Sequence, residues 1–184
     1  MEKKVFLVIL SLFLAFAIIA CTPEMAQKLT EGIPAVDPVD PNKDAKLFDI
    51  DADGAISLKE GATVPQALLI PEKVDEKEVK SVKKCTGSFT SVTIPGHVET
   101  IDVEAFKDCD KLETLVIEDG VELIDENAFG ACTALKMIII NSEGIKIDTE
   151  AFPNLSSETE FWYMGKQYED ITAIRKEIAK QTGV

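Results

Sequence analysis

The chain has 184 residues and a formal net charge of −14, with 33 acidic and 19 basic side chains. Such acidity argues against nucleic-acid binding, which needs basic patches that replace counterions on the phosphate backbone. The composition includes one histidine, which excludes the metal-spaced histidine pairs that many hydrolases use.

Residues 1–20 have the pattern of a secretory signal, in which two lysines precede an apolar run. The run is too short and too close to the N-terminus for a membrane-spanning helix. It ends in IIAC, residues 18–21, which resembles the bacterial lipobox. The resemblance implies that Cys21 is lipidated and becomes the first residue of the mature protein. The alternatives are an ordinary signal peptide or an uncleaved anchor, in which Cys21 is incidental.

Residues 21–39 are largely polar and contain several prolines, with no sustained apolar period. This composition predicts a flexible tether between the membrane and the folded part. The residues beyond the signal are numerous enough for one domain of ordinary size.

Residues 40–65 contain the segment DIDADGAISLKE, from Asp49 to Glu60. It resembles an EF-hand loop, which needs glycine at position six for a sharp turn, and Gly54 stands there. Carboxylates this close together repel one another until a cation binds, so we predict a calcium site with a structural role. The resemblance implies the calcium ligands Asp49, Asp51, Asp53, Ala55, Ser57 and Glu60.

The flanks of this segment fit an EF-hand less well than the loop does. Asp40 and Pro41 are a good start for a short helix through residues 43–48. Gly61 and Pro65 limit the following helix to barely two turns, and the sequence has no second loop for pairing. The alternative is an acidic turn that binds no metal.

An internal repeat with a period of 23 residues follows. Each unit places apolar residues at alternate positions of a short strand and then an Ala-Phe pair. One such unit cannot bury its apolar side alone, so the fixed period predicts a solenoid with a continuous core. The corresponding residues include Val92, Leu115 and Ile138; Ile101, Ile124 and Ile147; and Phe106, Phe129 and Phe152.

The motifs SVTIP and IDxxAF, with a cysteine that closes the unit, are similar to the BspA-like leucine-rich repeats of bacterial surface proteins. The resemblance covers residues 66–165. It implies an α/β-type solenoid, a short and mostly β leucine-rich repeat stack preceded by the EF-hand-like loop. Leu69, Ile70 and Pro71 mimic TIP in a degenerate first repeat, and Phe161 and Tyr163 keep the spacing a last time.

The C-terminal residues 166–184 change to a helical period, with Ile171, Ile174 and Ile178 on one face. We predict a helix that caps the open end of the stack. Within the repeats, Cys109 and Cys132 are expected to be buried free thiols rather than a disulfide or a metal pair. The pattern does not place Cys85.

A function should involve residues that the core does not need, and alternate strand residues point out of the sheet. An exposed apolar patch on that face would mark a partner surface. The alternatives are that the C-terminal helix covers the face or that the ladder packs on itself. The predicted partner-binding residues are Thr93, Val116, Met137, Ile139 and Trp162.

The sequence has no nucleophile elbow and no glycine-rich phosphate loop, so we predict no enzyme and no small-molecule substrate. The predicted function is that of an exported, lipid-anchored, non-catalytic module for protein binding or adhesion. Its predicted location is the bacterial cell envelope, at the outer membrane or cell surface, with an unidentified protein ligand. The alternative is a calcium-responsive regulatory or envelope-scaffold lipoprotein.

Overall fold

The structure is a computed structural model that describes residues 44–183. The predicted export signal, the predicted lipidation site Cys21 and the predicted tether therefore lie outside the described residues. Within residues 44–183, no helix is both long enough and apolar enough to cross a membrane.

The described chain forms two six-stranded sheets. Sheet A has the spatial order β1 (Phe48–Ile50), β2 (Ala55–Leu58), β6 (Ser81–Lys84), β8 (Thr100–Ile101), β10 (Leu123–Ile124) and β12 (Lys146–Ile147). Sheet B has the order β14 (Lys166–Tyr168), β13 (Glu160–Tyr163), β11 (Met137–Ile140), β9 (Thr114–Ile117), β7 (Ser91–Ile94) and β3 (Ala67–Leu69). The remaining elements are η1 (Ala45–Leu47), the hairpin of β4 (Lys73–Val74) and β5 (Lys77–Glu78), and α3 (Ile171–Thr182).

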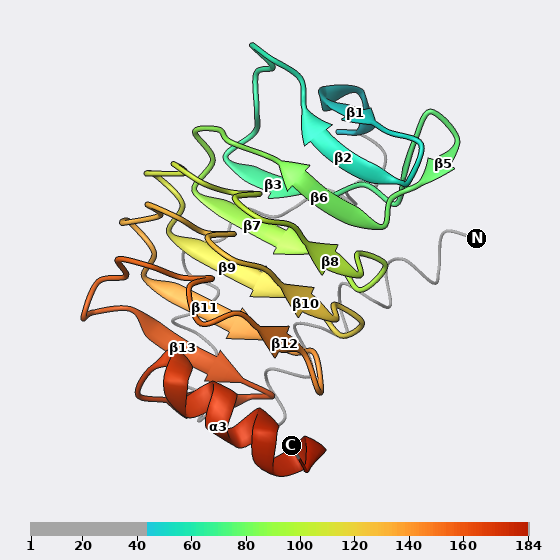
Figure 1. The fold of residues 1–184 in the computed structure, drawn as a ribbon. Helices are drawn as coiled ribbons and strands as arrows, with labels where there is room; N and C mark the ends of the chain where they lie inside the picture. Colours follow the sequence, from blue (N-terminus) through green and yellow to red (C-terminus); the bar gives the residue numbers. More distant parts are fainter. Residues whose placement is uncertain (1–43, 184) are drawn as a thin grey trace, which may run out of the picture. The chain divides into compact units, whose positions relative to one another are not determined.

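The chain winds through the two sheets as a solenoid (Figure 1). Each coil gives one strand to sheet A and the next repeat strand to sheet B, so that β2 and β3 form the first coil and β12 and β13 the last. The strands of neighbouring coils are parallel, with Val92 beside Leu115 and Ile138 beside Phe161. This register confirms the predicted repeat. It also confirms the degenerate first repeat, because Leu68 pairs with Val92 and Val82 with Ile101.

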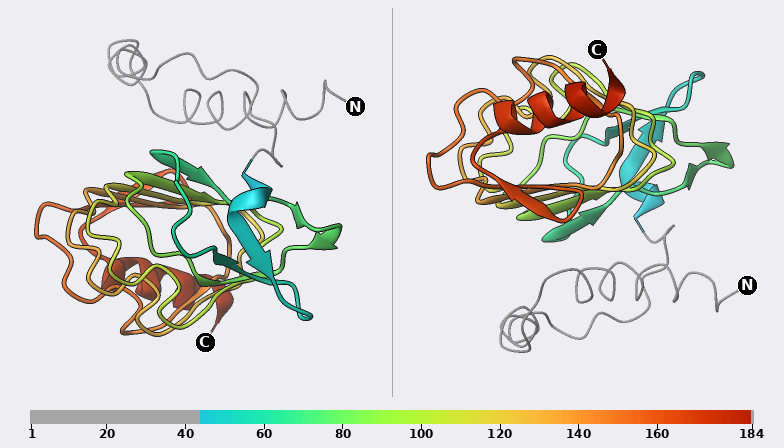
Figure 2. Two further views of the ribbon diagram at one scale, coloured as in Figure 1. Left: turned by 90° about the horizontal axis from the view of Figure 1, so that it is seen from above. Right: turned by 90° about the horizontal axis from the view of Figure 1, so that it is seen from below.

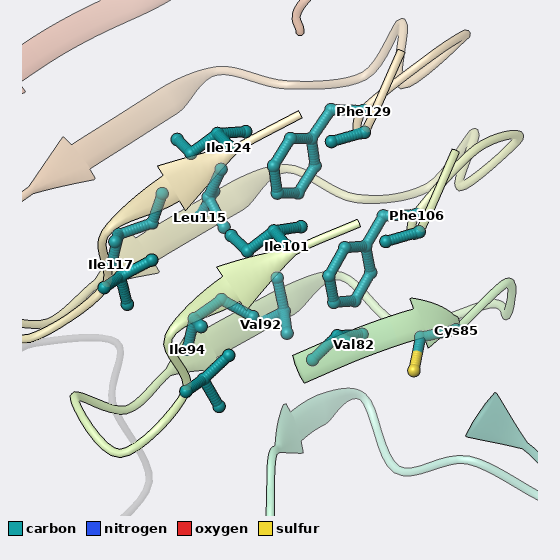
Figure 3. Close-up of a cluster of buried hydrophobic side chains, with 14 of the residues drawn as sticks. Val82, Cys85, Val92, Ile94, Ile101, Phe106, Leu115, Ile117, Ile124 and Phe129 are labelled. Atoms are coloured by element: carbon teal, nitrogen blue, oxygen red, sulfur yellow. The ribbon is translucent and has the colours of Figure 1, made fainter. Parts of the chain in front are cut away.

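The core lies between the two sheets, which face each other when the solenoid is viewed along its axis (Figure 2). In β7, β9 and β11 the second and fourth residues are buried and the first and third are partly exposed, as the two-residue alternation of strands requires. Figure 3 shows side chains of neighbouring coils stacked in this interior, including Ile101 above Val82 and Ile124 above Ile101.

Aromatic and thiol side chains fill the loop side of each coil. The Phe106 and Phe129 rings are stacked with centroids 5.2 Å apart, and those of Phe129 and Phe152 are 4.9 Å apart. Cys109 and Cys132 are buried free thiols, as predicted, and so is Cys85. Burial raises the pKa of the Cys85 thiol, so it stays protonated and serves as a core residue.

At the N-terminal end, the segment Asp49–Glu60 folds differently from an EF-hand loop. The predicted helix over residues 43–48 is only one 3-10 turn, η1, because Phe48 is fully buried as the first residue of β1. β1 then pairs with β2 in an antiparallel hairpin. The second helix, expected after Glu60, does not form: residues 59–62 make a turn in which the Ala62 N–H donates to the Lys59 carbonyl oxygen at 3.1 Å.

At the C-terminal end, the predicted capping helix is confirmed as α3. Asp170 caps its N-terminus by accepting a hydrogen bond from the Ala173 N–H at 2.7 Å, and Ile174 and Ile178 are buried. Strand β14 was not expected from the sequence. It follows a two-residue turn in which Met164 and Gly165 both have positive φ, the geometry that favours a tight hairpin.

Candidate functional site

The outer surface of sheet B, which we call face B, consists of alternate residues on β7, β9, β11 and β13. The residue after β9, β11 or β13 continues the ladder, because its N–H donates to the last carbonyl of the preceding repeat strand. Face B therefore has three outward positions in each of these four coils: Ser91, Thr93 and Pro95; Thr114, Val116 and Glu118; Met137, Ile139 and Asn141; Glu160, Trp162 and Met164.

The structure brings the predicted partner-binding residues together on face B. Thr93, Val116, Ile139 and Trp162 are in one row, each directly beside the next. Met137 is in the neighbouring row, beside Thr114. These side chains are partly exposed, and their role in binding stays a prediction.

Sequence reasoning missed Met164, which adds to the apolar part of face B. Its side chain is 48% exposed, one of the two most exposed large apolar residues among those described. The sequence contained one clue to its position, because Met164 is 23 residues after Asn141. It was missed because it lies beyond the end of the strand pattern. Met164 lies beyond Trp162 along the same chain segment, in the row of Glu118 and Asn141 and in the turn that leads to β14.

The charge of face B is negative. Glu118 and Glu160 are its charged residues, and the twelve outward positions named above include no lysine or arginine. Burial raises the pKa of Glu118, an effect that a hydrogen bond with the Gly96 backbone partly offsets. The Trp162 indole N–H donates to Glu160 Oε2 at 3.5 Å. The nearby Lys136 pairs with Glu113 at 2.9 Å.

The outer surface of sheet A, which we call face A, has a different character. Its outward positions on successive coils include Ser81, Thr100, Leu123 and Lys146. This row contains two hydroxyl residues, one leucine and one lysine, and charges of both signs lie beside it, with Lys83 on β6 and Asp102 directly after β8. Face B, with Val116, Ile139 and Trp162 in one row, is therefore the more apolar of the two sheet surfaces.

Helix α3 covers the end of the solenoid rather than face B (Figure 1). The Arg175 guanidinium donates to the carbonyl oxygens of Asp148 and Thr149, in the last coil beyond sheet A. Tyr163, whose ring points into the core, donates its hydroxyl to Gln181 Oε1 at 3.0 Å. The alternative that the capping helix covers face B is therefore wrong.

The second candidate site is the acidic hairpin between β1 and β2. Asp51 Oδ1 accepts hydrogen bonds from the N–H groups of Asp53 and Ala55, at 2.9 and 3.0 Å. Asp51 Oδ2 is 2.6 Å from the Lys83 ammonium. The Lys83 hydrogen bond, and after it that from Ala55 N–H, lowers the pKa of Asp51 from 3.8 to about 2. A lysine thus already neutralises the central carboxylate of the segment.

The hairpin does not gather the predicted calcium ligands. Asp49 pairs with Ser57, and Glu60 lies beyond the Phe48–Leu58 pair, at the opposite end of the hairpin from Asp53. The Ala55 carbonyl accepts the Asp51 N–H at 3.0 Å. Among residues 44–183, no three histidine, cysteine, aspartate or glutamate side chains are placed to hold one metal ion. The donor types suit calcium but this conformation does not, and calcium binding itself stays a prediction.

Residues 70–179 match the BspA type leucine rich repeat region, in six copies. This chain belongs to the BspA-type leucine-rich repeat family. The match spans more than half of the chain and ends within α3. It agrees with the solenoid, because the repeat strands from β6 to β13 and the stacked phenylalanines lie within the matched residues.

Solved structures of leucine-rich repeat proteins resemble this BspA-type chain. A leucine-rich repeat protein from Bacteroides capillosus is 26% identical with a TM-score of 0.50, over 63% of this chain and 91% of that one. The leucine rich repeat protein of T. pallidum is 21% identical with a TM-score of 0.48, over 66% of this chain and 64% of that one.

A leucine rich cell surface protein from Faecalibacterium prausnitzii is 23% identical with a TM-score of 0.41, over 61% of this chain and 35% of that one. No curated protein matches the BspA-type chain at a significant level. The likeness to the Bacteroides protein supports the solenoid fold.

Proposed function

We propose that this chain is an exported, lipid-anchored protein of the bacterial cell surface that binds another protein through face B and catalyses no reaction. The observation that supports a binding role most directly is the row of Val116, Ile139 and Trp162, held in register by three strands of one rigid sheet. Family membership supports the role further, because repeat solenoids commonly use extended sheet surfaces for binding.

Substitutions on the two faces test this proposal. The full chain is assayed for binding to a panel of purified extracellular-matrix and envelope proteins. The double variant Val116→Ser and Ile139→Ser should bind its partner at least about tenfold more weakly, because hot-spot side chains contribute most of the affinity. Leu123→Ser, on face A, is the matched control. Equal losses in both variants, or no binding by the unchanged chain, would contradict the proposal.

The lipid anchor is a separate part of the proposal, supported by the IIAC motif at residues 18–21. Bacteria that make the chain would be grown with an alkyne-tagged fatty acid. The unchanged chain should carry the tag and sediment with membranes, and Cys21→Ser should lose both properties. A tagged Cys21→Ser chain would show that the lipid is attached elsewhere, and an untagged unchanged chain would contradict the lipid anchor.

Calcium binding by residues 49–60 is also a proposal, supported by the types and order of the oxygen ligands. We expect weak affinity, on the order of 10⁻⁴ to 10⁻³ M, as in extracellular calcium modules. Because the Lys83 ammonium is bonded to Asp51, Lys83→Met should bind calcium more tightly than the unchanged chain. Calorimetric titration of both proteins is the test.

A further double variant completes the calcium test. The double variant Asp49→Ala and Glu60→Ala should show no calcium heat if these residues are ligands. No heat from either the unchanged chain or Lys83→Met would reject the calcium proposal and leave an acidic turn neutralised by lysine. A large loss of partner affinity on calcium chelation would favour the alternative, a calcium-responsive regulatory lipoprotein.

A further inference from the structure

We propose that the partner of face B is a cationic protein segment, with apolar side chains between two lysine or arginine residues. This inference rests on the proposed function and adds the chemistry of the partner. It starts from the two carboxylates of face B, Glu118 and Glu160, and from the absence of a lysine or arginine among the twelve outward positions of β7, β9, β11 and β13 described above.

The carboxylates of face B have no salt-bridge partner within the chain that the structure describes. Ion pairs among residues 44–183 engage other acids, such as Glu113 with Lys136 and Asp51 with Lys83. Glu160 accepts one weak hydrogen bond from an indole, and Glu118 is partly desolvated. Both carboxylates can therefore still form an ion pair with a cationic partner. For Glu118, the opposite charge would offset the unfavourable desolvation of its carboxylate.

The distance between the two carboxylates sets the spacing of the basic residues that a partner would need. Glu118 follows the end of β9 and Glu160 starts β13, with β11 between these strands. Neighbouring strands are about 4.8 Å apart and residues along a strand about 3.3 Å, so the two positions are separated diagonally by roughly 16 Å. Ile139 lies between them on β11. An extended partner would meet both carboxylates with basic residues about four or six positions apart, because alternate residues of an extended segment point to the same side.

The net charge of the whole chain also favours a cationic partner. Its net charge of −14 attracts cationic partners over distances beyond direct contact and speeds their association. The same charge repels acidic segments. An apolar surface between two carboxylates thus selects a partner that is both apolar and basic.

A phage library of short random peptides, selected on the full chain, tests this inference. Peptides are kept if they lose binding to Ile139→Ser but not to Leu123→Ser, so that they report on face B. We expect the retained peptides to carry net positive charge, with basic residues on both sides of an apolar centre. The double variant Glu118→Gln and Glu160→Gln should bind them about tenfold more weakly and with less dependence on salt.

The outcomes separate the two proposals. Retained peptides that are neutral or acidic, or that bind the glutamine variant unchanged, would overturn the cationic partner and leave protein binding by face B intact. If no selected peptide depends on Ile139, both proposals fail. The far-UV circular dichroism and melting temperature of each variant should match the unchanged chain, since all of these residues lie on the surface of the sheets.

Discussion

Two glycines of neighbouring coils, Gly96 and Gly120, lie in direct backbone contact at the turn that leaves sheet B. Gly120 has φ of +112°, and a Cβ there would overlap the Gly96 carbonyl oxygen. Gly120→Ala should therefore reduce the free energy of unfolding by about 3 kcal/mol, because backbone must move. The measurement is urea unfolding followed by circular dichroism.

Gly61→Ala is the matched control for that substitution. Gly61 also has positive φ, +73°, but a Cβ there would meet nothing within 4 Å. Gly61→Ala should reduce the free energy of unfolding by about 1 kcal/mol, because only the left-handed backbone conformation disfavours alanine there. Equal costs at the two glycines would mean that the close approach of the coils has no energetic role.

A left-handed backbone conformation recurs at another fixed position of the repeat, and in one coil an alanine adopts it. Asp108, Ala131 and Asn154 are 23 residues apart and have φ of 62°, 59° and 63°. Aspartate and asparagine tolerate this left-handed conformation better than alanine does. Ala131→Asn should therefore stabilise the fold by about 0.5–1 kcal/mol, measured by the same urea unfolding. A loss of stability would show that the neighbouring turn has no room for the amide.

The ion pair between Asp51 and Lys83 should make stability depend on pH in acid. The folded-state pKa of Asp51 is about 2, against 3.8 for an unperturbed side chain. The unfolded chain therefore binds a proton at higher pH than the folded chain does, and the stabilisation is lost as pH falls from about 4 toward 2. Melting temperatures across this range should fall more steeply for the unchanged chain than for Lys83→Met. Parallel curves would contradict the assignment.

Among the elements, α3 closes the last coil. Ile174 is fully buried and Thr172 is exposed on the same helix. Ile174→Ala should cost about 2–4 kcal/mol through the cavity it leaves, and Thr172→Ala less than about 0.5 kcal/mol. Thermal melts of the two variants compare these effects. A small loss at Ile174 would mean that the solenoid end needs no cap.

The elements that the sequence predicted best are those that repeat. β7, β9 and β11 each carry the same alternation, and the core requires it in every coil, so the 23-residue period was enough to assign register. β14 has no counterpart in the repeat, and its turn at Met164 and Gly165 lacks the usual asparagine. It is therefore visible only in the structure.

The acidic hairpin shows why a local motif can be predicted with the wrong fold. The spacing from Asp49 to Glu60 fits an EF-hand loop, yet Phe48 and Ile56 are fully buried and belong to strands of sheet A. Their burial in the solenoid core prevails over the weak helix signals on both sides of the segment. Lys83, which bonds to Asp51, is distant in sequence and could not be assigned to this site from spacing.

For the whole molecule, the period of the repeat predicted the architecture and also the composition of face B. The alternation that buries Ile138 and Ile140 leaves Ile139 outside, so the outward residues of face B could be named from the sequence. Two facts needed coordinates: α3 leaves face B uncovered, and the carboxylates of face B have no salt-bridge partner among the described residues. Both depend on contacts between distant segments.

Site-specific photo-cross-linking in bacteria that make the full chain tests the central claim most directly. A photoreactive phenylalanine analogue would replace Ile139 on face B or, as the control, Leu123 on face A. Partner binding by face B predicts a discrete protein adduct from position 139, absent from position 123 and from Val116→Ser chains labelled at 139. Equal adducts from both faces, or none from position 139, would contradict the assignment of face B as the binding surface.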